Sequence, residues 1–336
     1  MEARPARAGL CALLSALAGC ASQPAPLELG GAALGTTWSV KAIAPEAQRA
    51  ALTEGIDDRL DALVAEMSAW EPESALSRFN RAPEGSAHVL PAGLCAVLDH
   101  ALALARDTGG AYDPTVGALA ELWGFGPGAA PRQAPPARTQ IDAVLSQVGW
   151  RRLAFEPEPC RAHQPGGVHI DVSSLGPGYA VDRIAAQLDA AGISDYLVEL
   201  GGEMRARGQR PDGQPWRIAV ERPDDPAARD VVLALRDAAL GTSGDYRSGF
   251  VHEGRRYSHT LDPRTGEPIR HELAAVTVVA DSAMAADARA AALLVLGPEA
   301  GYAYARTHGI AAVFTLRAGE GYARRTTRAL ERYLQP

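Results

Sequence analysis

Thr242-Ser-Gly-Asp-Tyr-Arg247 opens the stretch that says most about the fold of this chain, and Tyr257-Ser-His-Thr-Leu-Asp-Pro-Arg-Thr-Gly-Glu-Pro-Ile269 closes it. Residues 248–256, with Phe250 and Val251 as their apolar members, separate these two turn-rich polar clusters. Residues 257–261 alternate with a period of two, which predicts a β-strand. The Asp-Pro and Thr-Gly pairs within residues 262–266 then predict a turn that ends the strand.

His259 is the residue of this stretch with the clearest chemical potential. The alternation places Tyr257, His259 and Leu261 on one face of the expected strand. A hairpin in a protein core has no need for a histidine and an aspartate (Asp262) at its end, whereas a functional site does. The alternative is that His259 is a structural histidine whose polar atoms are satisfied locally. The stretch by itself leaves both interpretations open.

Length and charge limit the classes of protein to consider. The 336 residues are enough for one large domain, or two interlocked subregions, around a sizeable core. The formal charge of −7 argues against nucleic-acid binding, which requires a basic face. No segment approaches the roughly 18 uninterrupted apolar residues of a membrane-spanning helix.

The N-terminus is typical of a bacterial lipoprotein signal. Arg4 and Arg7 supply a basic region, and residues 10–17 supply a short apolar segment. Leu17-Ala-Gly-Cys20 matches a lipobox, which predicts cleavage before Cys20 and attachment of lipid to its thiol. A simple secretory signal with small residues near the cut is the alternative. A lipidated Cys20 would tether a soluble domain to the periplasmic face of a membrane.

These features predict a signal peptide over residues 1–19 and a lipid-anchored tether over residues 20–30. The remaining residues, 31–336, form the expected functional domain, with a Gly-, Pro- and Ala-rich loop insertion at about 126–138. Ala21 stands where an aspartate would retain a lipoprotein at the inner membrane, so the outer membrane of a Gram-negative cell is the expected location.

Two cysteines remain after processing. The signal peptide removes Cys11 and lipidation occupies Cys20, which leaves Cys95 and Cys160. An oxidising compartment permits a disulfide, but the sequence does not predict whether the two pair. Cys95 lies on an apolar helical face, where a buried thiol is expected.

Hydrophobic periodicity predicts helices and strands in consecutive groups, which favours an α+β fold with a largely antiparallel sheet over a doubly wound fold. Ser282 and Gly297-Pro298 mark the start and stop of one helix. Helices are expected over 47–67, 94–106, 139–148, 283–296 and 299–308, together with one capped by Ser173 or Ser174 that carries Val181, Ile184 and Leu188 on its apolar face. Strands are expected over 34–43, 195–200, 203–208, 216–221, 230–237, 273–280 and 311–317, with a strand end at 168–171.

Six further segments, taken in order with residues 242–269, resemble the ApbE-like flavin transferases, a family once named for thiamine-biosynthesis lipoproteins. The resemblance extends over nearly the whole mature chain. The segments are Gly35-Thr-Thr-Trp-Ser-Val-Lys41, Met67-Ser-Ala-Trp-Glu-Pro-Glu-Ser-Ala-Leu-Ser-Arg-Phe-Asn80, Gly110-Ala-Tyr-Asp-Pro-Thr-Val-Gly117, Ile170-Asp-Val-Ser-Ser-Leu-Gly-Pro-Gly-Tyr-Ala-Val-Asp182, Glu199-Leu-Gly-Gly-Glu203 and Ala286-Asp-Ala-Arg-Ala-Ala-Ala292.

The resemblance implies a transferase that moves FMN from FAD to a Ser or Thr hydroxyl of a target protein and releases AMP. It implies FAD as substrate, Mg²⁺ as cofactor, and partners that are respiratory or redox subunits with an Asp-x-x-Ser/Thr-Gly-Ala-Ser/Thr motif. The chain has no Gly-x-Gly-x-x-Gly after a strand, no Walker loop and no Gly-x-Ser-x-Gly elbow. FAD would therefore bind by a route other than the dinucleotide-binding fold.

The resemblance also implies the roles of individual residues. His259 is the candidate general base for the acceptor hydroxyl, while Asp287 and Ser174 are candidate Mg²⁺ ligands. Asp287 has an ordinary alternative as an acid that complements a helix dipole, and Trp70 as a core aromatic. The candidate residues for contact with the flavin nucleotide are Leu34, Trp70, Ala111, Tyr112, Asp113, Asp171 and Leu261.

Two positions depart from the family pattern. Ala291 stands where the family usually has a metal-binding Thr, one helical turn after Asp287, and Pro177 stands where it commonly has a charged residue. Since Mg²⁺ retains water readily, weaker metal binding is expected rather than none. The alternatives are an FAD pyrophosphatase, in which water replaces the acceptor, and a catalytically weakened flavin-binding lipoprotein.

Overall fold

The computed structural model describes residues 26–127, 129–130, 132–225 and 227–335. The expected signal peptide, the lipidation site Cys20 with Ala21, and tether residues up to 25 lie outside these ranges. Strand β1 (Leu27–Ala33) already belongs to the main sheet, so the sheet begins within the segment expected as a tether. No helix in the described ranges is long and apolar enough to cross a membrane.

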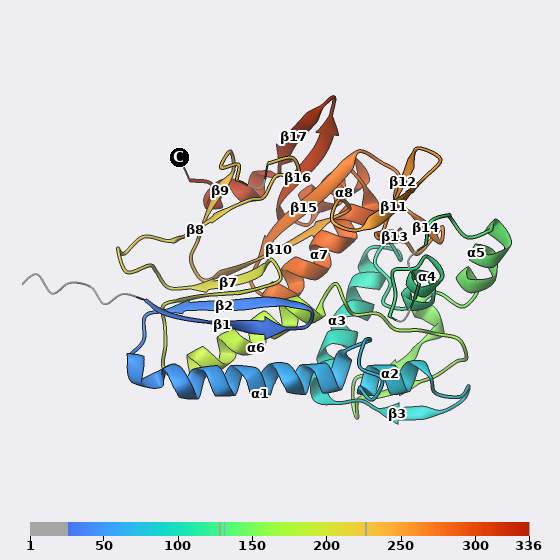
Figure 1. Ribbon diagram of the computed structural model, residues 1–336, viewed down its shortest axis with the longest axis horizontal. Helices are drawn as coiled ribbons and strands as arrows, with labels where there is room; N and C mark the ends of the chain where they lie inside the picture. Colours follow the sequence, from blue (N-terminus) through green and yellow to red (C-terminus); the bar gives the residue numbers. More distant parts are fainter. Residues whose placement is uncertain (1–25, 128, 131, 226, 336) are drawn as a thin grey trace, which may run out of the picture.

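An eight-stranded antiparallel sheet is the centre of the molecule (Figure 1), which confirms the α+β prediction. Its order is β1-β2-β6-β7-β10-β15-β16-β17. After β1, the strands are β2 (Thr36–Ala42), β6 (Tyr196–Leu200), β7 (Glu203–Arg207), β10 (Ala238–Gly244), β15 (Leu273–Ala280), β16 (Ala311–Ala318) and β17 (Gly321–Thr326).

Both faces of the sheet are covered, which explains why every residue of β15 is buried. Val276 and Val278 pack with Leu293 of a helix on one face, while Val279 packs with Leu233 on the other. The helices of the first face are α1 (Arg49–Met67), α6 (Gly176–Ala190), α7 (Ala283–Leu296) and α8 (Ala300–Thr307) (Figure 1). The second face carries β8 (Trp216–Ala219), β9 (Val232–Leu235) and the 3-10 helix η3 (Arg328–Tyr333).

A second subregion lies beyond the ends of α1 and α6, and the Cys95–Cys160 disulfide lies within it (Figure 1). The bond joins α3 to the segment that precedes β5, and it answers the question of pairing that the sequence leaves open. The elements of this subregion are α2 (Ala75–Asn80), α3 (Ala92–Asp107), α4 (Gly117–Leu122), α5 (Arg138–Leu145), β3 (Ala87–Val89), β4 (Ala154–Glu156), β5 (Arg161–His163), β11 (Gly249–His252), β12 (Arg255–Ser258), β13 (Leu261–Asp262), β14 (Glu267–Pro268) and a 3-10 helix at Trp150–Arg152. A further 3-10 helix, Glu46–Gln48, directly precedes α1.

The prediction of one continuous strand through His259 is wrong. Strand β12 ends at Ser258 and β13 begins at Leu261, because the backbone changes partners between them. His259 N donates to Ser248 O at 3.3 Å, whereas Ile269 N donates to Thr260 O at 3.0 Å. Tyr257 and Leu261 are buried, and His259 is turned out to the solvent side. The turn predicted at residues 262–266 is confirmed.

The strand predicted over residues 230–237 is shorter than expected, and the strand that follows it was not predicted. Asp237 adopts a left-handed backbone (φ 51°), which ends β9 and redirects the chain into β10. Asp tolerates this conformation better than most residues do. The redirection matters for function, since β10 carries Thr242 and Ser243 toward the cavity described below.

Candidate active site

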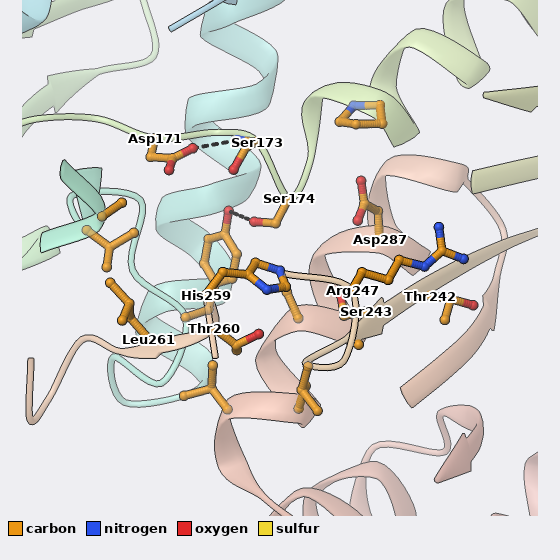
Figure 2. A pocket seen from close by; sticks show the side chains of 18 of the residues that line it. Asp171, Ser173, Ser174, Thr242, Ser243, Arg247, His259, Thr260, Leu261 and Asp287 are labelled. Atoms are coloured by element: carbon orange, nitrogen blue, oxygen red, sulfur yellow. Dashed lines mark hydrogen bonds between the residues drawn. The ribbon is translucent and has the colours of Figure 1, made fainter. Parts of the chain in front are cut away.

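Two adjoining cavities, of about 370 and 620 Å³, lie where the sheet, α6 and α7 meet the second subregion. They share Asp171, Ser173 and Pro177 in their walls. Of the residues that the sequence proposed, Ala111, Tyr112, Asp113, Asp171, Ser174, His259, Leu261 and Asp287 line the smaller cavity (Figure 2), and Leu34, Trp70 and Asp171 line the larger one. Residues from across the chain thus converge on one continuous region.

Asp287 lies on the first turns of α7, and its position depends on two glycines. A Cβ at Gly241 would stand 2.4 Å from Asp287 N, and a Cβ at Gly178 would stand 2.5 Å from Ala283 O. These glycines let β10 and α6 approach α7 closely. Gly178 N donates to Asp287 Oδ2 at 3.2 Å. Asp287 is only 4% exposed, so its carboxylate is held largely away from solvent near the start of α7.

Glu203, at the start of β7, is a second buried carboxylate in the same cavity. Burial, together with the charge of Glu199, raises the pKa of Glu203 to about 7. Burial and the charge of Glu203 raise the pKa of Asp287 well above its usual range. The cavity therefore brings two buried acids together, and a bound cation or protons would offset their charge.

The loop that precedes α6 contributes residues to the walls of both cavities. Asp171 Oδ1 accepts a hydrogen bond from Ser173 N at 2.8 Å, which closes a tight turn. Ser174 Oγ donates to Tyr112 Oη at 3.2 Å. Asn80 fixes the backbone just before this turn, since its side chain donates to Ile170 O and accepts from Ile170 N. Asn80 thus supports the loop from outside the cavities.

The carboxylate of Asp113 accepts hydrogen bonds from backbone and side-chain groups near it. Its Oδ1 accepts from the backbone N and the hydroxyl of Thr115, and its Oδ2 accepts from Trp150 N at 2.8 Å. Burial raises the pKa of Asp113 despite these bonds. The carboxylate is therefore engaged in holding the segment that presents Ala111 and Tyr112 to the cavity.

His259 reaches the cavity from the break between β12 and β13 (Figure 2). Its Nδ1 lies 3.2 Å from Ser248 O. Because a carbonyl oxygen only accepts, this contact places the ring proton on Nδ1 and leaves Nε2 as the basic nitrogen. Desolvation by the surrounding atoms lowers the pKa of His259, although the ring keeps access to solvent. The neutral, proton-accepting form therefore predominates at pH 7.

Leu34 and Trp70 stand at the larger cavity and are exposed. Leu34 occupies the β1–β2 turn with a positive φ of 53° and is 36% exposed. Trp70 follows α1 and is 71% exposed, so it is not the core aromatic of the alternative interpretation. An exposed indole and an exposed leucine beside one cavity provide an apolar surface for a planar ligand.

Several polar residues of the smaller cavity received no role from the sequence, among them Glu203, Arg247, Thr242 and Ser243. Glu203 and Arg247 lie within the motifs quoted above, but nothing in their spacing reveals that they face Asp287. No group of three or more His, Cys, Asp or Glu residues that could hold a metal occurs in the described ranges. The available donors for a cation are two carboxylates together with hydroxyl and backbone oxygens.

The sequence is similar to proteins of known activity along nearly its full length. A protein named FAD:protein FMN transferase from Klebsiella pneumoniae (strain 342) is 36% identical, with 95% of this chain and 93% of that protein aligned. The protein of the same name from Escherichia coli (strain K12) is 35% identical, with 96% and 95% aligned.

Solved structures agree with the sequence comparison. The apo crystal structure of the flavinyl transferase ApbE from Pseudomonas stutzeri matches with a TM-score of 0.84 and 38% identity, covering 91% of this chain and 96% of that one. The flavin transferase ApbE from Vibrio cholerae matches with a TM-score of 0.85 and 34% identity, covering 93% and 100%. The model of the ApbE family matches residues 34–314. The chain belongs to the ApbE family.

Proposed function

We propose that this protein is an FAD:protein FMN transferase that links FMN to a Ser or Thr hydroxyl of a target protein and releases AMP. The observation that carries the proposal is the near full-length similarity to proteins of that name, from more than one organism. The paired cavities support it, because an elongated dinucleotide needs two connected compartments, and Asp171 belongs to the walls of both.

The donors in the smaller cavity suit Mg²⁺. Magnesium prefers oxygen ligands and is commonly held by one or two carboxylates together with water and substrate phosphates. Asp287 and Glu203 are buried carboxylates in the wall of this cavity, and Ser174 adds oxygen from the loop before α6. We assign Asp287 and Ser174 as ligands, with Glu203 contributing charge. Mg²⁺ bound there would offset negative charge on the phosphates of FAD.

The remaining residues act on the substrate and the acceptor. Leu34 and Trp70 bind a planar ring of FAD in the larger cavity, and Leu261 adds apolar surface in the smaller one. Asp113 shapes the loop that carries Ala111 and Tyr112, while Asp171 orients the turn between the cavities. These roles position the pyrophosphate of FAD near His259.

The transfer step needs a base for the acceptor hydroxyl. The hydroxyl oxygen attacks the FMN phosphorus, the bond between that phosphorus and the bridging oxygen breaks, and AMP leaves with the bridging oxygen. His259 Nε2 takes the hydroxyl proton, since its other nitrogen is held by Ser248 O. A lowered pKa keeps His259 neutral, and thus basic, at physiological pH.

Acceptor and location are part of the proposal. We propose a respiratory or redox subunit with an Asp-x-x-Ser/Thr-Gly-Ala-Ser/Thr motif as acceptor, and a lipid anchor on Cys20 at the periplasmic face of the outer membrane. The disulfide between Cys95 and Cys160 supports an oxidising compartment.

Mass spectrometry of a purified acceptor domain carrying that motif, incubated with this protein, FAD and Mg²⁺, tests the function. The expected result is an acceptor mass increased by FMN, with the increase absent for Asp287→Ala. AMP release without a modified acceptor would instead establish a pyrophosphatase. Intact FAD that stays bound would establish a flavin-binding protein without transfer activity.

A further inference from the structure

Arg247 is a cation in the wall of a cavity dominated by acids. It is the only arginine or lysine among the described residues that line the smaller cavity, where Asp113, Asp171, Glu203 and Asp287 supply carboxylates. It follows β10 by three residues, in the segment that leads to β11. A lone guanidinium in such a wall has a natural ligand in the phosphates of a substrate.

The side chain of Arg247 is hydrogen-bonded to a residue outside the cavity. Arg247 Nη2 donates to Glu221 Oε2 at 2.8 Å, and Tyr246 Oη donates to Glu221 Oε1 at 3.1 Å. Glu221 is not part of the cavity wall. Since a guanidinium carries five N–H donors in a planar fork, one arm can hold Glu221 while the other arm meets an anion.

The side chain of Arg247 points away from His259, the proposed base. Figure 2 shows its side chain extending toward the side of the cavity that carries Asp287 and Thr242, away from the ring of His259. The charge of Arg247 also acts on Glu203, whose pKa it lowers. In this view the Asp287 side chain lies between the ring of His259 and the guanidinium of Arg247 (Figure 2).

We propose that Arg247 binds the phosphate that departs as AMP, which rests on the transferase function proposed above. In phosphoryl transfer the attacking and leaving oxygens lie roughly in line. With His259 on the side of the attacking hydroxyl, a cation on the other side meets the bridging oxygen as it receives the electron pair of the breaking bond. The proton goes to His259, so Arg247 stabilises charge and transfers none.

Replacement of Arg247 tests the proposal through kcat, KM for FAD and product inhibition by AMP. Arg247→Met should lower kcat by about 10²-fold to 10³-fold, with a smaller change in KM, because the interaction strengthens as the leaving phosphate gains charge. It should also weaken AMP inhibition by about tenfold or more. Arg247→Lys should recover part of kcat. Arg255→Met is the matched control, since Arg255 stacks on Tyr257 and does not line the cavity.

Glu221→Gln separates charge stabilisation from loop structure. It removes the ion pair that Arg247 makes outside the cavity but keeps the guanidinium, so its loss of kcat should stay below about tenfold. A kcat for Arg247→Met within threefold of the parent value, or an unchanged inhibition constant for AMP, would overturn the role of Arg247. A parent protein that modifies no acceptor and releases no AMP would instead refute the transferase function. AMP binding measured by calorimetry still tests Arg247 in that case, since Arg247→Met should weaken it and equal affinity would exclude the contact.

Discussion

Asp287 on α7 and Glu203 on β7 present two buried carboxylates to one cavity, with 4% and 7% of their surfaces exposed. The charge of Glu203 adds to burial in raising the pKa of Asp287. Holding both groups away from water costs the folded state free energy unless a cation or protons join them. The arrangement thus links folding stability, pH and cation binding through two named residues.

Without a bound cation, the folded protein should lose stability as the pH rises from about 5 to about 8. An acid whose folded-state pKa is raised stabilises the fold below its unfolded pKa, and that contribution is lost as the pH passes the folded value. For Glu203 the pKa rises from 4.5 to about 7, which corresponds to about 3 kcal/mol. Urea unfolding in EDTA at the two pH values measures the loss.

Glu203→Gln should reduce this pH dependence and leave the part due to burial of Asp287, and Mg²⁺ should stabilise the parent protein more at pH 8 than at pH 5. Glu54→Gln on the exposed face of α1 is the matched control, because it removes an acid that water already solvates. Equal pH slopes for Glu203→Gln and the parent protein would show that Glu203 is not the group that titrates.

His259→Gln should reduce FMN transfer by about 10²-fold to 10⁴-fold while leaving FAD binding largely intact. Glutamine keeps hydrogen-bonding capacity but cannot accept the hydroxyl proton. In the parent protein, kcat/KM should fall as the pH drops through a value below 6.5, because desolvation lowers the pKa of His259 and the protonated ring is no longer a base. Acceptor labelling over a pH series, with FAD affinity measured separately, checks both statements.

His163→Gln is the control for this experiment, since His163 lies on β5 and pairs with Glu156 away from both cavities. An acid limb that persists unchanged in the residual activity of His259→Gln would assign the titration to a different group. Unchanged transfer by His259→Gln would remove His259 from the mechanism.

Periodicity and local signals predict most of the fold: α1 and α3 carry helical repeats, Ser282 and Gly297 mark the ends of α7, and β15 is an almost uninterrupted apolar run. They miss β10, whose Ala-Ala-Leu-Gly-Thr-Ser-Gly sequence has little β-branched content and whose start depends on the left-handed Asp237. The break at His259 cannot be predicted from the sequence either, because the alternation continues through residues whose backbone changes hydrogen-bond partners.

Motif resemblance predicts which residues belong to the site, but it does not predict how they are arranged in space. The two-cavity arrangement depends on contacts between distant segments, such as Gly178 N with Asp287 Oδ2, that no local pattern encodes. Glu203 and Arg247 can be assigned to the site only from the structure, in which they line the same cavity as Asp287. Tertiary structure, not local sequence, determines the electrostatics of the site.

Ala291→Thr should strengthen Mg²⁺ binding by about tenfold. Ala291 lines the smaller cavity one helical turn after Asp287, so a hydroxyl there adds an oxygen to the proposed ligand set. Calorimetric titration with Mg²⁺ measures the change, and the transfer rate should rise mainly at low Mg²⁺. Ala291→Val is the matched control, because valine has the shape of threonine without the hydroxyl. Equal affinities for the two variants would mean that the position does not reach the cation.

Loss of the Cys95–Cys160 disulfide should destabilise the protein by about 4 kcal/mol, the chain-entropy value for a loop of this size. The two cysteines are 65 residues apart, and the bond joins α3 to the chain just before β5. Urea unfolding of the Cys95→Ser, Cys160→Ser double variant measures the loss. Reductant should destabilise the parent protein by a similar amount and leave the double variant unaffected. Equal stability of parent and variant under oxidising conditions would show that the bond does not constrain the unfolded chain.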